Sequence, residues 1–115
     1  MSFVINVGTD RNGAEPTNAL KTEQEVFSVF HEHITGVSWA TSPAIGDWPE
    51  ESILVAKLDC VLLPIDAVKR LCELTHQHAI AVWDCDNEVG RLVWSDITPD
   101  HVERFTFDRE YFHFG

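Results

Sequence analysis

Alternating apolar residues mark the first predicted element. In the segment Ser2–Val7, three apolar side chains, Phe3, Ile5 and Val7, fall on the same face. Side chains of a β-strand alternate between two faces, so this spacing predicts a strand with one heavily buried face. The next segment, Gly8–Asn18, is rich in Gly, Asn, Asp and Pro, which predicts a long loop.

The hydrophobic pattern then changes to a helical period. Thr22-Glu23-Gln24-Glu25 has the sequence of a capping box, in which a threonine begins the helix and a glutamate three residues later bonds back to it. We therefore expect a helix from Thr22 to about Ile34. Four residues at helical spacing should form its inward stripe. They are Val26, Phe27, Phe30 and Ile34.

Two further strands are predicted in the middle of the chain, separated by a second long loop. Val37–Thr41 is short and apolar, Ser42–Glu51 contains two prolines and a glycine, and Ser52–Leu62 is again apolar. The alternation in the last segment changes phase near Ala56-Lys57, which predicts a β-bulge or an early end of the strand.

A second helix and a hairpin follow. Pro64 suits the first turn of a helix, and His76 and His78 are expected in the last turn. Its inner stripe comprises Ile65, Val68, Leu71, Cys72 and Thr75. Ala79–Asp84 is a continuous apolar run and predicts a buried strand. Turn residues at Cys85–Gly90 then lead into Arg91–Trp94, which completes a hairpin.

The end of the chain is aromatic. Thr98-Pro99-Asp100 predicts a helical turn, and Phe105 and Phe107 alternate as in a strand. The tail Tyr111–Phe114 should dock on its own domain or on a partner, because so many aromatic side chains are unfavourable in water. The predicted order β-α-β-β-α-β, with an additional hairpin strand and this tail, indicates an α+β fold of the ferredoxin-like type. In that fold, the strands Phe3–Val7 and Ala79–Asp84 are central.

Composition narrows the function. A chain of 115 residues is expected to be a single domain, 1–115. It has no apolar run long enough to span a membrane, and its first residues do not resemble a secretory signal, so we expect it in the cytoplasm. Its three cysteines, Cys60, Cys72 and Cys85, lack the spacing of a disulfide framework and should be reduced.

The charge is strongly acidic: 8 basic against 19 acidic side chains give a net charge of −11. Nucleic acids and anionic membranes should repel such a chain. The charge is explained either by solubility alone or by a basic protein partner, as for an immunity protein or a DNA mimic.

Asp84, Asp86 and Glu88 alternate after a buried strand and form the first candidate site. They suit either a divalent-metal or acid/base cluster, or a hydrophilic hairpin turn. A calcium loop is excluded because Gly90 falls at the seventh position of the loop, and Ser95 replaces the bidentate glutamate.

A second candidate site pairs a thiol with an imidazole. Cys72 and His76 are four residues apart and share a helix face, so a zinc site can be drawn with Cys60 or Cys85. Alternatively, the histidine interacts with the negative end of the helix dipole. No catalytic residue and no cofactor is predicted, because no nucleophile, base and acid are brought together and no phosphate loop is present.

The tryptophans are the third candidate. Trp39, Trp48, Trp83 and Trp94 could line a small-molecule pocket together with Asp84. Alternatively, they fill the core and contacts between two copies.

One stretch carries a resemblance to known proteins. The pattern of Leu71, Leu74, His78 and Ile80–Asp84 resembles that of small uncharacterised bacterial α+β proteins, some carried on mobile gene cassettes such as those of integrons and others resembling toxin-immunity proteins. The resemblance implies a bacterial adaptive or interaction role.

Two functional hypotheses follow. The first is a non-enzymatic acidic protein of immunity type that binds a protein partner, or a second copy through the sheet or the aromatic C-terminus. The alternative is a small-molecule-binding protein or small enzyme with a pocket between the sheet and the loops 8–18 and 42–51.

Overall fold

The structure is a computed structural model that describes residues 2–9, 19–42, 51–62, 65–95, 103–105 and 112–114. Within these residues, two helices and six strands follow one another along the chain. In order, they are β1 (Ser2–Gly8), α1 (Ala19–Phe30), β2 (Ile34–Ser42), β3 (Glu51–Asp59), α2 (Ile65–Thr75), β4 (Ala79–Asp84), β5 (Val89–Trp94) and β6 (Glu103–Phe105).

All six strands belong to one antiparallel sheet, in the order β2-β3-β1-β4-β5-β6. The predicted α+β class is therefore confirmed. β1 lies between β3 and β4, so the two strands expected at the centre of the sheet are its middle strands. The predicted hairpin is also present, with Ala79 of β4 opposite Trp94 of β5.

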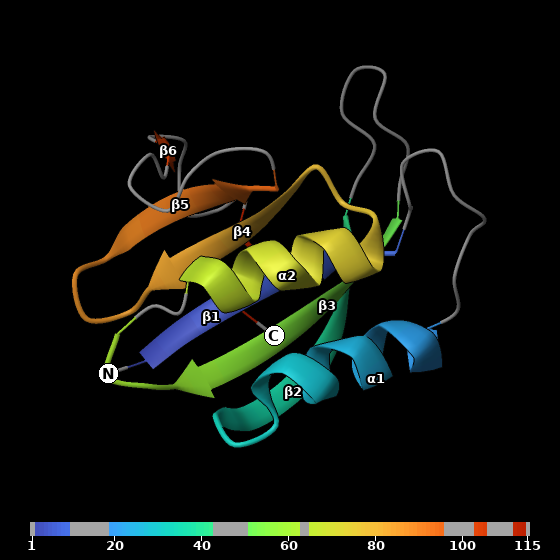
Figure 1. Ribbon diagram of the computed structural model, residues 1–115. Helices are drawn as coiled ribbons and strands as arrows, with labels where there is room; N and C mark the ends of the chain where they lie inside the picture. Colours follow the sequence, from blue (N-terminus) through green and yellow to red (C-terminus); the bar gives the residue numbers. More distant parts are fainter. Residues whose placement is uncertain are drawn as a thin grey trace.

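Both helices lie on the same face of the sheet (Figure 1). The buried stripe of α2 is the one predicted from the sequence, except that Ile65 is only half-buried. Alternate residues of the strands meet these helices, as the period of two requires. The resulting core includes Phe3, Ile5, Val7, Val26, Phe30, Leu54, Ala56, Leu58, Val68, Leu71, Cys72, Ile80, Val82 and Val93.

The face of the sheet opposite the helices, called here the tail face, carries a second and smaller core. It is defined by Val4, Ile53, Val55, Trp83 and Phe112, with Ala40, Ala81 and Phe114 packed against them. Phe112 is buried, so for residues 112–114 the structure shows the first of the two predicted alternatives, docking on the chain's own domain. The central strands are apolar on both faces because each face packs against another part of the chain.

α1 differs from its prediction at both ends. The helix begins at Ala19, so Thr22 is an internal residue, and the predicted capping box is wrong. Thr22 is fully buried in the stripe with Val26 and Phe30, and its hydroxyl lacks a hydrogen-bond partner among the described residues. Phe27, expected inside, is 42% exposed. Ile34, expected to end the helix, is the first residue of β2.

The expected irregularity in β3 lies instead in its neighbour. β3 has no bulge: it pairs with β1 without interruption from Ile53 to Asp59, where it ends three residues before the predicted end at Leu62. The register of β2 instead shifts between Ile34 and Gly36. The apparent phase change at Ala56 arises because residues 53–56 are buried on both faces of the sheet. Burial on both faces removes the alternation on which the prediction relied.

The end of α2 is a Schellman motif. The amide of His76 donates to the carbonyl of Glu73, and that of Gln77 donates to the carbonyl of Cys72. This motif usually has glycine in the left-handed position, and here His76 occupies it with φ of 53°. His76 and His78 therefore lie beyond the helix, not in its last turn.

Several predictions fall on residues outside the described ranges. They concern nearly all of the two long loops, together with Trp48, the segment Thr98–Asp100, Phe107 and Tyr111. Among the helices that are described, none has the length and apolarity needed to cross a membrane.

Candidate functional site

Trp39 lies on β2, at one edge of the sheet. Its side chain is on the face that carries the helices, and its indole Nε1 donates to a carboxylate oxygen of Glu23 on α1 at 2.8 Å. The ring remains 36% exposed. This hydrogen bond holds a large aromatic side chain in a fixed position between the edge strand and the helix.

Two further exposed apolar side chains lie on the same flank of α1. Leu20 and Phe27 are seven residues apart, so they share a helix face, and they are 61% and 42% exposed. Glu23, the partner of Trp39, lies between them along the helix. Together, Leu20, Phe27 and Trp39 form an apolar strip beside β2, called here the edge strip.

β2 itself carries no charge. Its nine residues, Ile34–Ser42, include neither a charged side chain nor a proline. β3 pairs with one side of β2, and no strand pairs with the other side among the described residues. Exposed edge strands are usually protected by charges, prolines or short length. The length and neutrality of this edge suit it to pairing with another strand.

The tail face holds an aromatic cluster around Trp83. Phe112 and Phe114 both contact the indole ring, with centroid distances of 5.9 Å and 5.5 Å, and they lie 5.1 Å from each other. Trp83 is only 8% exposed. Edge-to-face and tilted rings at these distances attract one another in addition to burying apolar area. Trp83 is therefore a packing residue that anchors the C-terminal segment.

A pair of hydrogen bonds fixes the same segment to the centre of the sheet. The side-chain amide of Asn6 on β1 donates to the carbonyl of His113 at 2.8 Å, and the amide of His113 donates to Asn6 Oδ1 at 2.9 Å. A carboxamide on an apolar sheet face is costly unless both of its groups are bonded. Asn6 meets this requirement by binding the backbone of the tail as a neighbouring strand would.

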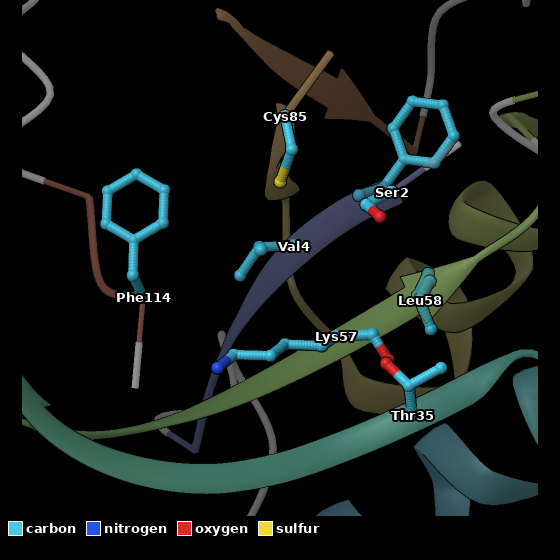
Figure 2. Close-up of a pocket in the computed structure, with 8 residues that line it drawn as sticks. Ser2, Val4, Thr35, Lys57, Leu58, Cys85 and Phe114 are labelled. Carbon is cyan, nitrogen blue, oxygen red and sulfur yellow. The ribbon is translucent and has the colours of Figure 1, made fainter.

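A hollow of about 250 Å³ adjoins this cluster. Figure 2 shows Val4 and Lys57 projecting toward the side of the sheet where the ring of Phe114 lies. The hollow is lined by Ser2, Phe3, Val4, Thr35, Lys57, Leu58, Cys85 and Phe114. It lies at the end of the sheet where β1 begins, whereas the loops after Gly8 and before Glu51 join the opposite strand ends. It is therefore not the pocket expected between the sheet and those loops.

The chemistry of the hollow is mainly apolar. Lys57 is exposed and has no ion-pair partner within the described part of the chain, and the hydroxyl of Thr35 donates to the carbonyl of Lys57. Cys85 is exposed and forms no disulfide, and its backbone amide donates to the carbonyl of Ser2. This mainly apolar lining, with the ammonium group of Lys57 at its side, suits the binding of an apolar group.

Asp84 serves the hairpin turn. It is 5% exposed and accepts hydrogen bonds from the backbone amides of Asp86 and Asn87 and from the side chain of Asn87. Burial raises the pKa of this carboxyl, but these bonds outweigh that effect and hold the pKa below its usual value. Asp86 instead accepts from the backbone amide of Ser2. The geometry is that of a turn, the second of the two alternatives.

Cys72 and His76 are not directed at a common site. Cys72 is fully buried, and its thiol donates to the carbonyl of Val93 at 3.5 Å. Burial raises the pKa of this thiol to about 12. His76 is exposed beyond the helix end. Among the described residues, no group of three or more His, Cys, Asp or Glu side chains is arranged to hold a metal ion.

Among the described residues, the three tryptophans do not all face one pocket. Trp39 and Trp83 lie on opposite faces of the sheet. Trp94 is on the same face as Trp83, but it pairs with Ala79, which is four residues before Trp83 on β4. Trp48 lies outside the described residues. Sequence reasoning missed Asn6, Lys57 and, apart from Trp39, the edge strip, since only the strand order reveals the neighbours of these residues. Comparison of the chain with protein-family models, with curated proteins and with solved structures gave no match.

Proposed function

We propose that this protein is a non-enzymatic interaction domain that binds a basic protein partner along the edge strand β2. The observation that carries the proposal is the uncharged, nine-residue edge of the sheet beside the edge strip. A partner strand would pair with the backbone of β2, and its alternate side chains would contact Trp39 and Phe27. Backbone pairing supplies affinity in such complexes, and contacts with side chains supply specificity.

The acidic charge supports a basic partner over a second copy. The net charge is −11. Glu23 lies beside the edge strip, and Glu32 lies in the turn that precedes β2. Two copies brought together at this edge would repel each other, whereas a lysine-rich or arginine-rich strand would be attracted. A homodimer through the sheet is accordingly the competing proposal.

The proposal also covers the fold type, the class of partner and the cellular compartment. The segment from β1 to β4 is proposed to be ferredoxin-like, supported by the order β2-β3-β1-β4. The resemblance of Leu71–Asp84 to immunity-type and cassette-borne bacterial proteins favours a toxin as the basic partner. The three cysteines form no disulfide, which supports a reducing compartment such as the cytoplasm.

A titration with a designed strand tests the proposal. The probe is a peptide of alternating lysine and valine residues, about as long as β2, added to the ¹⁵N-labelled protein. We expect amide shifts concentrated in β2 and α1, and affinity that falls as salt is added. A peptide with glutamate in place of lysine should bind at least about tenfold more weakly, a ratio that corresponds to about 1.4 kcal/mol.

Two matched variants locate the interface. Thr41→Lys places a charge on the exposed edge strand and should lower the affinity for the lysine peptide by at least about tenfold. Gln24→Lys adds the same charge on the exposed side of α1 and should change the affinity by less than about threefold. Equal loss in the two variants would mean that only the net charge matters, and absence of shifts in β2 would refute the edge-strand interface.

A further inference from the structure

The tail face has the features of a peptide site. At its centre, Asn6 offers a donor and an acceptor side by side, and both are used by the backbone of one residue, His113. Asn6 therefore binds the backbone of the segment, whatever the side chain at that position. The same arrangement would accept any extended segment that crosses the sheet here.

Aromatic side chains on either side of that residue complete the contact. Phe112 and Phe114 both pack against Trp83, while His113 makes no side-chain hydrogen bond among the described residues. The site thus selects for two aromatic residues separated by one residue of any type. We propose that the tail face is a binding site for an aromatic-x-aromatic segment of another protein, and that residues 112–114 occupy it as an internal ligand.

The hollow beside Phe114 makes an external ligand competitive. The tail runs toward the hollow, because Phe114 lines it and Phe112 does not. With a volume of about 250 Å³, it is smaller than the roughly 300–1,000 Å³ of sites for drug-sized ligands. It has room for one more apolar side chain of a longer peptide.

A segment of another protein is favoured over the tail of a second copy. Exchange of tails between two copies would replace each contact with an identical one, so it adds no interaction at this face. Two chains of net charge −11 would also repel each other. This site is on the opposite face from the edge strip and does not depend on the function proposed for β2.

Peptide titrations of the full-length chain test this site. The probes are a peptide with the sequence of residues 111–115, the same peptide with serine replacing both phenylalanines, and a longer peptide with leucines after the second phenylalanine. Binding is followed by the side-chain amide resonances of Asn6. We expect the longer peptide to bind about tenfold more tightly than the short one, because it also fills the hollow, and the serine peptide not to bind.

Variants of the full chain separate recognition from competition. Replacing both Phe112 and Phe114 with serine should increase affinity for the longer peptide by at least about tenfold, because the internal ligand acts at a millimolar effective concentration. Leu62→Ser, a change at a side chain that is 76% exposed, should leave it unchanged. Asn6→Asp should abolish binding, because a carboxylate cannot donate to the peptide carbonyl, whereas Gln24→Glu should not.

Several outcomes would overturn the proposal. If the longer peptide fails to shift Asn6 in both the wild-type chain and the serine variant, the face is not a peptide site. Equal binding of the phenylalanine and serine peptides would remove the aromatic requirement. A wild-type dimer that the serine variant abolishes would assign the face to a second copy. If the serine variant does not fold, the wild-type titration with the three peptides decides the question alone.

Discussion

Removing the contacts of residues 112–114 should destabilise the fold only up to a limit, which is the free energy with which this segment docks on the sheet. Phe112 is 5% exposed and lies 5.9 Å from the ring of Trp83. Burial of a phenylalanine contributes about 1.5–3 kcal/mol, and a favourable aromatic pair adds about 0.5–1.5 kcal/mol. We therefore expect Phe112→Ala to lower the free energy of unfolding by about 3 kcal/mol, which lies within the usual range for such substitutions.

The second substitution should cost much less than the first. Phe112, His113 and Phe114 dock as one short segment, so the total loss cannot exceed the free energy of docking. Once Phe112→Ala has released the segment, Phe114→Ala should add less than about 1 kcal/mol. Asn6→Ala should likewise cost little in the double variant, because Asn6 is then open to water.

Urea denaturation of the single, double and triple variants measures these differences. Deletion of Tyr111–Gly115 should give the same stability as the double variant, and each lost kcal/mol should lower the melting temperature by about 4–8 °C. Independent costs of about 3 kcal/mol for each phenylalanine would refute docking as a unit. An unchanged melting temperature in the deletion variant would refute the contribution of the tail altogether.

Three further predictions concern local features. Asp84→Ala should cost about 2 kcal/mol at pH 7 by urea denaturation. Because the folded pKa of Asp84 is lowered, this contribution is present above the unfolded pKa of about 3.9 and should disappear as the pH falls through the folded pKa. Equal losses of unfolding free energy at pH 7 and pH 2 would contradict the role of its charge. His76→Gly should raise the melting temperature, because glycine relieves about 1 kcal/mol of strain at φ of 53°, and a lower melting temperature would contradict this. Timed iodoacetamide labelling read by mass spectrometry should modify exposed Cys85 first and buried Cys72 only on unfolding, and early labelling of Cys72 would contradict its burial.

The sequence predicted the elements whose period is strong. The stripe of α2 has four fully buried residues at helical spacing, and the turn after Asp84 is rich in turn residues. The boundaries of α1 were missed because a capping signature at Thr22 competes with the good helix formers Ala19, Leu20 and Lys21 before it. Tertiary packing decided the outcome, since Thr22 faces the sheet with Val26.

The candidate sites depended on contacts that no local pattern contains. Asn6 and His113 are separated by 107 positions in the chain, and Asn6 occupies an alternate strand position that in sequence indicates solvent. The neutral composition of β2 is visible in the sequence, but its place at the edge depends on the strand order. Trp39 was singled out for its size, and its exposure follows from that edge position.

Hydrogen exchange of the β2 amides in the free, full-length protein tests the central claim most directly. If the outer edge of β2 is open to a partner strand, amides that bond to β3 should exchange slowly, and the alternate amides of Ile34–Ser42 should exchange at nearly the rate of an unfolded peptide. Adding the lysine-valine peptide should then slow those alternate amides. Slow exchange at every position of β2 in the free protein would contradict the account, because it would mean that this edge is already paired.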